Sequence, residues 1–176
     1  MGLRERWKGH REHLPTGTRE ALALGPGERL LAWTLEDGTG AVVAATTQRL
    51  RVLDPAGGLT LQVPWHEVQH GVWDPEASTL RVELVGAEPT RRWSFSGEPR
   101  ALLQTLLERV QASVVVAEEV EVGPRRRARV AVRQDLATGR LLEQVVPSSP
   151  AAAEDPQVRA AAAEALARLR DDVGLT

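Results

Sequence analysis

The sequence predicts an α+β protein. We expect a seven-stranded antiparallel barrel or sandwich capped by a helix, then a C-terminal β extension and a terminal amphipathic helix. Between residues 25 and 95, short apolar runs alternate with turn signals at intervals of roughly 8–12 residues, a spacing typical of an antiparallel meander. An apolar stripe with helical spacing follows at residues 99–110. Further strand-like runs and one long helical pattern occupy the remainder of the chain.

Seven segments of this meander are expected to form strands. Apolar residues occupy alternate positions in most of them, which is the period of a strand with one buried face. The run from Ala41 to Ala45 is continuous and predicts a strand buried on both faces. Pro64 places the end of the fourth segment at an edge or corner, because proline has no N–H to donate to a neighbouring strand. The seven segments are residues 31–35, 41–45, 50–53, 59–63, 68–73, 80–84 and 93–95.

A capping helix is expected after the seventh strand. A sheet with this pattern would otherwise leave one apolar face in contact with water. Pro99 suits the first turn of a helix, where the missing N–H has no partner to lose. The apolar stripe of this helix consists of Leu102, Leu103, Leu106, Leu107 and Val110.

A β extension and a second helix are predicted beyond it. Residues 114–122 and 127–133 are expected to pair as a hairpin around Gly123, and residues 141–146 to add a third strand. Asp155 is a good N-cap for the last helix. The apolar stripe of that helix includes Val158, Leu166 and Leu169. The stripe could dock on this chain or on a partner.

These elements divide the chain into four parts. Residues 1–18 form an N-terminal segment, with a short helix expected within residues 2–13, and residues 19–113 form the meander with its helix. Residues 114–147 form the β-hairpin extension, and residues 148–176 form a linker and the C-terminal helix. A chain of 176 residues can bury a sizeable core without a disulfide or a metal.

The composition excludes several classes of function. The chain has no cysteine, which rules out a disulfide framework, a thiolate zinc site and a cysteine nucleophile. The formal net charge of −2 provides no general attraction to nucleic acid or anionic lipid. No signal peptide and no apolar run of about 18 residues is found, so we expect a cytoplasmic protein without a transmembrane segment. No cofactor is expected, because no phosphate-binding glycine loop is found.

Three short motifs occur in the order and spacing of a known superfold. Pro26-Gly27-Glu28-Arg29 precedes the first strand, Ala45-Thr46-Thr47-Gln48-Arg49-Leu50 joins the second to the third, and Val63-Pro64-Trp65-His66-Glu67-Val68 leads into the fifth. Together with seven strands and one helix, these motifs resemble bacterial pleckstrin-homology-like (PH-like) domains over residues 20–113. The whole chain also resembles a family from high-GC Gram-positive (actinobacterial) species with the same C-terminal extension. Thr47 departs from the pattern, since those domains usually have Asp or Asn there.

The resemblance implies a non-catalytic interaction module. PH-like domains commonly bind peptides or proteins, often by adding a strand to an open sheet edge. The expected partner surface consists of Trp65, His66 and Trp73 at that edge and of Val158, Leu166 and Leu169 on the last helix. A homo-oligomer is an alternative to a separate partner. Phosphoinositide binding is not expected, because the acidic loop at residues 36–40 would repel a phosphorylated headgroup.

An enzymatic alternative comes from His66-Glu67-Val68-Gln69-His70, which matches the H-E-x-x-H motif of zinc hydrolases. On a helix, this spacing would place both imidazoles on one face, with the glutamate beside the metal-bound water. Pro64 and Gly71 flank the motif, and strand-like runs surround it, so we expect extended backbone instead. Imidazoles four residues apart on a strand are about 13 Å apart, too far for one zinc ion.

Nucleic-acid binding is a second alternative. The basic cluster that could contact phosphates consists of Arg125, Arg126, Arg127 and Arg129. Glu119 and Glu121 precede the same turn with the parity to pair across the hairpin. No aromatic residue alternates with the arginines to stack on bases. We therefore favour a hairpin with cross-strand ion pairs.

Overall fold

The computed structural model describes residues 14–86 and 90–175. This part of the chain is an α+β protein with ten strands, four α-helices and one 3₁₀ turn. The helix expected within residues 2–13 lies outside the described residues. In chain order the elements are α1 (Thr18–Ala21), β1 (Leu30–Leu35), β2 (Val42–Thr46), β3 (Arg49–Leu53), β4 (Leu59–Pro64), η1 (Trp65–Glu67), β5 (Val68–Asp74), β6 (Thr79–Leu84), β7 (Arg91–Ser94), α2 (Arg100–Ala112), β8 (Val114–Gly123), β9 (Arg126–Gln134), β10 (Leu141–Pro147), α3 (Pro150–Glu154) and α4 (Pro156–Asp172).

The first seven strands form two antiparallel sheets, which corrects the prediction of one seven-stranded barrel or sandwich. One sheet has the order β1-β2-β3-β4 and the other the order β5-β6-β7. They separate because β4 ends at Pro64 and the chain turns through η1 before β5 begins. The two sheets are joined where β1 ends and β7 ends, because the N–H of Asp37 donates to the carbonyl of Ser94 at 2.9 Å. The described strands therefore form no closed barrel.

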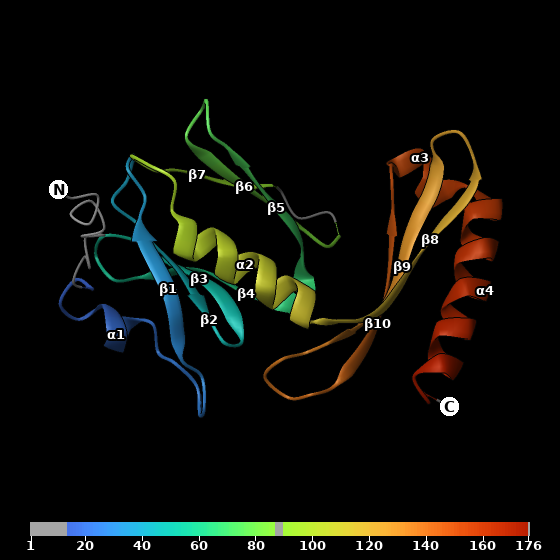
Figure 1. The fold of residues 1–176 in the computed structure, drawn as a ribbon, viewed down its shortest axis with the longest axis horizontal. Coiled ribbons are helices and arrows are strands. Elements are labelled where there is room, and N and C mark those ends of the chain that lie inside the picture. Colours follow the sequence, from blue (N-terminus) through green and yellow to red (C-terminus); the bar gives the residue numbers. More distant parts are fainter. Residues whose placement is uncertain (1–13, 87–89, 176) are drawn as a thin grey trace, which may run out of the picture.

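Residues 14–86 and 90–113 form the first unit, in which α2 contacts β1, β2 and β5 (Figure 1). Leu102 and Leu106 of α2 are buried, as the apolar stripe predicts. Trp65 is fully buried, and its Nε1–H donates to the carbonyl of Thr46 at 3.0 Å. The same core contains Val43, Leu50, Val52, Val63, Val68, Leu80, Val82 and Phe95.

A second apolar cluster covers the other face of the four-stranded sheet. The segment that contains α1 packs Leu22 against Val42 and Leu53. Every residue of β2 is consequently buried, as its continuous apolar run predicts. The four-residue helix α1 was not predicted, because a single turn has too few residues to show helical periodicity.

A buried ion pair holds this segment against the sheet. Nη2 of Arg51 donates to Oε2 of Glu28 at 2.7 Å, and both side chains are almost completely enclosed. Nη1 of Arg51 donates to the carbonyl of Leu22 at 2.6 Å, and the hydroxyl of Thr46 donates to Glu28. Burial alone would raise the pKa of Glu28, but the hydrogen bonds that it accepts, first from Thr46, and the charge of Arg51 together lower it.

Residues 114–175 form the second unit, a three-stranded antiparallel sheet with α4 on one face (Figure 1). The strand order is β10-β9-β8, and the hairpin of β8 and β9 has the predicted pairing, with Glu121 opposite Arg127. The core between the sheet and α4 consists of Val120, Ala128, Val130, Val132, Val158, Ala162, Ala165 and Leu169.

The apolar stripe of α4 is covered by its own sheet. Val158 and Leu169 are buried, and Leu166 packs against the same core. This corrects the expectation that these three residues face a partner, and the reason is that the apolar face of β9 needs the same cover. The predicted N-cap is confirmed, because the carboxylate of Asp155 accepts hydrogen bonds from the N–H groups of Gln157 and Val158.

A short helix replaces part of the expected linker. Oγ of Ser149 caps α3 by accepting a hydrogen bond from the N–H of Ala152 at 3.1 Å. Asp155 is both the C-cap of α3 and the N-cap of α4. Since Ala152 is buried, the alanines after Pro150 belong to the packed second unit rather than to a linker.

We expect Glu28→Gln to lower the free energy of unfolding by about 3 kcal/mol, because the guanidinium of Arg51 would stay buried without a counter-charge. Chemical denaturation at pH 7 followed by tryptophan fluorescence measures this loss. The pKa of Glu28 is lowered by folding, so its contribution is complete above the ordinary carboxyl value of 4.5 and is lost as the pH falls further. Equal stability of variant and wild type at pH 7 would contradict this prediction.

Candidate functional site

The chain after Pro64 forms a turn and then an edge strand. Trp65–Glu67 make the 3₁₀ turn η1, so extended backbone is not found there. Val68–Asp74 make β5, which confirms the expected strand. β5 ends the order of its sheet, so its outer edge pairs with no other strand in the described part of the chain. The strand carries backbone hydrogen-bonding groups along this outer edge.

The two histidines of the H-E-x-x-H motif lie in different surroundings. Nδ1 of His66 lies 4.0 Å from a carboxylate oxygen of Asp135, whereas Nε2 of His70 lies 3.5 Å from a carboxylate oxygen of Glu83 on β6. No regular helix places the two rings on one face, because His66 is in η1 and His70 is in β5. Among residues 14–86 and 90–175, no group of three His, Cys, Asp or Glu side chains could hold a metal ion.

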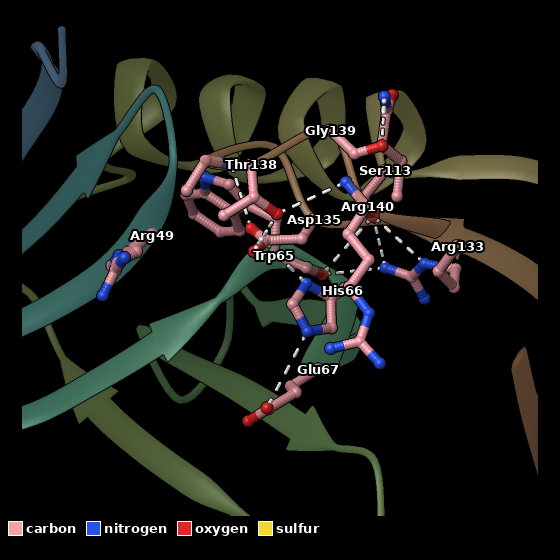
Figure 2. Close-up of polar contacts among 12 residues, drawn as sticks. Arg49, Trp65, His66, Glu67, Ser113, Arg133, Asp135, Thr138, Gly139 and Arg140 are labelled. Atoms are coloured by element: carbon pink, nitrogen blue, oxygen red, sulfur yellow. Dashed lines mark hydrogen bonds and ion pairs between the residues drawn. The ribbon is translucent and has the colours of Figure 1, made fainter. Parts of the chain in front are cut away.

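Arg133 of β9 joins the second unit to the turn (Figure 2). It is only 5% exposed, and its Nη2 donates to the carbonyls of Trp65 at 2.7 Å and Val68 at 3.2 Å. Its Nε and Nη2 also donate to Oγ of Ser113, the residue that follows α2. A buried carbonyl requires a hydrogen-bond donor, and the second unit supplies it to the turn.

The contact of Gln144 with the turn is of the same kind. Nε2 of Gln144 in β10 donates to the carbonyl of His66 at 2.6 Å. Nδ1 of His66 is buried and makes no hydrogen bond with the described residues. Burial lowers the pKa of His66, and the carboxylates of Asp135 and Glu67 oppose this shift only in part. The side chain is 12% exposed, so His66 belongs to the junction of the two units and not to an exposed partner surface, as had been expected.

A groove of about 390 Å³ lies between β5 and α2. The lining residues from β5 are Gln69, His70, Gly71 and Trp73. The lining residues from α2 are Leu103, Leu106, Leu107, Val110 and Gln111. Val114, Arg129 and Arg133 of the second unit border the groove where α2 leads into β8. The walls are thus mainly apolar, and no Asp or Glu is among these lining residues.

Gly71 sets the distance between β5 and α2. A Cβ atom at this position would lie 2.8 Å from Cδ2 of Leu106, closer than side chains allow. Beyond this contact the apolar stripe of α2 continues, with Leu103 and Val110 partly buried and Leu107 56% exposed. The stripe is therefore wider than the core requires, and the excess lines the groove.

Two arginines give this end of the groove a positive charge. Arg133 makes its hydrogen bonds to neutral acceptors, and neither Arg129 nor Arg133 forms an ion pair with a carboxylate of the described residues. Burial, together with the like charge of Arg129, lowers the pKa of Arg133 to about 10. The guanidinium consequently stays protonated at neutral pH.

The expected aromatic anchors have different positions. Trp65 is fully enclosed, which overturns the expectation of an exposed indole at this corner. The turn after Pro64 directs the ring into the core, where the carbonyl of Thr46 accepts its N–H. Trp73 is half-buried, lies 6.3 Å from Phe95 between ring centroids, and lines the groove. Of the two indoles, Trp73 is available to a ligand.

The four arginines that were considered as an alternative anion site do not all line one hollow. Arg126 pairs with Asp155 at 2.7 Å, and Arg127 pairs with Glu121 at 3.2 Å, which confirms one of the predicted cross-hairpin pairs. A hollow of about 600 Å³ is lined by Arg125, Arg126, Arg127, Ser148, Ser149, Ala151, Ala152 and Asp155. Arg129 lines the groove instead.

The loop after β1 keeps its negative charge. The carboxylate of Glu36 accepts hydrogen bonds from the hydroxyl and N–H of Thr39 and from the N–H of Gly38. The hydrogen bond from the Thr39 hydroxyl lowers the pKa of Glu36, and burial opposes it only in part. An ionised carboxylate at this position disfavours a phosphorylated ligand at the loop.

Comparison with known proteins gives a distant structural likeness. A scan against protein-family models and a search of curated proteins found no match. A search of solved structures found a DUF1696 family protein with a pleckstrin-homology domain from Shewanella loihica PV-4. The two chains are 15% identical, the likeness covers 53% of this chain and 92% of that one, and the TM-score is 0.42. In the described part of the chain, no helix has the length and apolar character needed to cross a bilayer.

Gly71 and Arg133 were not identified as site residues from the sequence. The available signal for Gly71 is a glycine inside a strand, which often marks a close approach of another element. The signal for Arg133 is a single charged residue at the end of the apolar run Val130–Val132. Both signals indicate an unusual environment. Neither shows which residues are in contact, because the contacts are with distant parts of the chain.

We expect Gly71→Val to lower the free energy of unfolding by about 1–3 kcal/mol, because the new side chain would displace Leu106 and push α2 away from β5. Gly97→Val is the matched control, since a Cβ at Gly97 meets no atom within 4 Å. Denaturant titration measures both variants. Equal stabilities of the two variants would show that the packing of α2 against β5 does not require a glycine at position 71.

Proposed function

We propose that this protein is a non-catalytic interaction module that binds an extended segment of a partner protein as an added strand along β5. The segment would form backbone hydrogen bonds with the outer edge of β5 and place alternate side chains in the groove against α2. This mode of binding takes its affinity from main-chain hydrogen bonds and its specificity from pockets for every second side chain.

The unpaired edge of β5 beside an apolar groove carries this proposal. The strand Val68–Asp74 is seven residues long. The carbonyl of Val68 already accepts a hydrogen bond from Arg133, and the residues after it are enough for several ladder hydrogen bonds. Leu107 and Trp73 offer apolar surface on the two sides of the groove. Soluble proteins usually protect sheet edges, and an edge that is open next to apolar surface fits a ligand of extended backbone.

The lining of the groove favours one kind of occupant. Apolar walls suit a segment with apolar residues at alternate positions. Arg129 and Arg133, without acidic neighbours in the lining, disfavour a basic segment and favour an acidic one. We therefore propose an apolar and acidic segment of another protein, with a second copy of this chain as the rival that the test must distinguish.

The sequence motifs that resemble PH-like domains support the same role, since such domains commonly bind peptides in this way. The absence of cysteine favours a reducing compartment such as the cytoplasm. Zinc hydrolysis and nucleic-acid binding are less well supported, because the two histidines are apart and the arginines are divided between separate contacts.

A displayed library of random peptides provides the probe. We expect selected peptides to bind in solution with shifts of backbone amide NMR signals concentrated in Val68–Asp74 and in the facing turns of α2. Leu107→Asp should weaken binding at least tenfold, corresponding to about 1.4 kcal/mol, because it places a charge on the exposed apolar wall. Leu59→Asp is the control, since Leu59 is 44% exposed on β4 and does not line the groove.

Three results would count against the proposal. Amide shifts confined to another surface would place the binding site elsewhere. Full affinity of Leu107→Asp would show that α2 is not part of the site. Dimerisation through the β5 edge, seen by sedimentation and abolished by Leu107→Asp, would identify a second copy as the occupant.

A further inference from the structure

We propose that Arg133 and Arg129 form a carboxylate-binding site at the second-unit end of the groove, which recognises an acidic group of the bound segment. This inference rests on the proposed function and adds the chemistry that the partner must present. It concerns the place where Val114 and the two arginines border the groove.

Arg133 is a buried cation without a counter-ion in the described chain. Its Nε and Nη2 donate to the hydroxyl of Ser113 and to the carbonyls of Trp65 and Val68, all of which are neutral. Its Nη1 makes no hydrogen bond with the described residues, although Arg133 is only 5% exposed and lines the groove. A charge removed from water is costly unless an opposite charge is supplied, so an anion in the groove would relieve this cost.

The buried ion pair of the first unit provides a useful contrast. Arg51 is as enclosed as Arg133, but its guanidinium contacts the carboxylate of Glu28 at 2.7 Å. At Arg51 the chain itself thus supplies the carboxylate that compensates the buried charge. At Arg133 the corresponding carboxylate is missing from the described residues, and the open side of the guanidinium borders a groove.

Arg129 adds a second positive charge to this end of the groove. It lies four residues before Arg133 on the same strand, and side chains separated by an even number of residues share one face of a sheet. Glu119 is directly opposite Arg129 in the register, yet no ion pair joins the two. The neighbouring pair of Glu121 and Arg127, by comparison, closes to 3.2 Å. The charge of Arg129 is thus available to a ligand.

The site is preorganised on one side and adaptable on the other. Three acceptors fix the guanidinium of Arg133, so its conformational freedom is already lost before a ligand arrives. Arg129 is exposed and can adjust to the ligand. One free nitrogen of Arg133 and the fork of Arg129 suit the two oxygens of a singly charged carboxylate, and the apolar walls disfavour a phosphate dianion.

The decisive experiment uses an acidic peptide from the display selection and compares its affinity by calorimetry with that of four analogues. In the analogues, each Asp or Glu is replaced by its amide, the C-terminal carboxylate is amidated, both changes are combined, or a phosphoserine replaces the acidic residue. We expect one of the first two changes to weaken binding roughly tenfold, which identifies a side chain or the chain terminus as the source of the carboxylate. Phosphoserine should not bind more tightly than the acidic residue.

Arg129→Gln and Arg127→Gln form the matched pair of protein variants. Both remove one exposed positive charge from the same face of β9, but only Arg129 lines the groove. Arg129→Gln should lower the affinity for the acidic peptide roughly tenfold and leave the affinity for its amide analogue unchanged. Arg127→Gln should change neither affinity. Equal losses for the acidic peptide and its amide analogue would overturn the carboxylate site, as would tighter binding of phosphoserine, while the proposed strand addition would stand.

Sodium acetate tests the anion site without any peptide. At constant ionic strength set with chloride, acetate should shift the guanidinium NMR signals of Arg133 in the wild type and in Arg127→Gln, and less in Arg129→Gln. A selection that yields no groove-binding peptide would contradict the proposed function. The acetate titration would then show by itself whether Arg133 and Arg129 bind a carboxylate. Absence of an acetate response in the wild type would overturn it.

Discussion

The turn at Trp65–Glu67 creates a need for hydrogen-bond donors that the rest of the structure satisfies. A 3₁₀ turn between two strands takes backbone carbonyls out of the sheet ladder, and buried carbonyls without donors are strongly unfavourable. Arg133 donates to the carbonyl of Trp65, and Gln144 donates to that of His66. The second unit is therefore positioned by the backbone of the first. The same turn separates β4 from β5 and leaves the edge of β5 open.

Much of the local structure could be predicted because it follows from patterns within short stretches. The strands of the meander, α2, the β8–β9 hairpin and the N-cap of α4 all have local signals in spacing, turn residues or capping residues. The division of seven strands into two sheets was missed, since it depends on how one three-residue turn packs. α3 was interpreted as a linker, although Ser149 before Pro150 was a usable helix-start signal.

The candidate site was harder to predict because it combines distant segments. Trp65 follows a proline at a corner, and the sequence does not show whether such an indole faces the core or the solvent. The apolar stripe of α4 likewise predicts burial without naming the surface that covers it. The groove requires Gly71 and Leu106 to meet across the first unit, and Arg133 to reach the turn from the second. The apolar stripe of α2 is broader than one core face requires. It was the one sequence signal of an exposed apolar surface at this site.

The walls of the groove belong to two units, and this has a consequence for motion. β5 and α2 belong to the first unit, whereas Val114 and Arg129 belong to the second. Any segment that touches both walls favours the angle between the units at which its contacts are best, and by reciprocity that angle sets its affinity. Substitutions of Ser113, whose buried hydroxyl accepts hydrogen bonds from Arg133 at the junction of the units, would then change ligand affinity without touching the ligand. Distances between spin labels on the two units, compared with and without bound peptide, would measure this linkage directly.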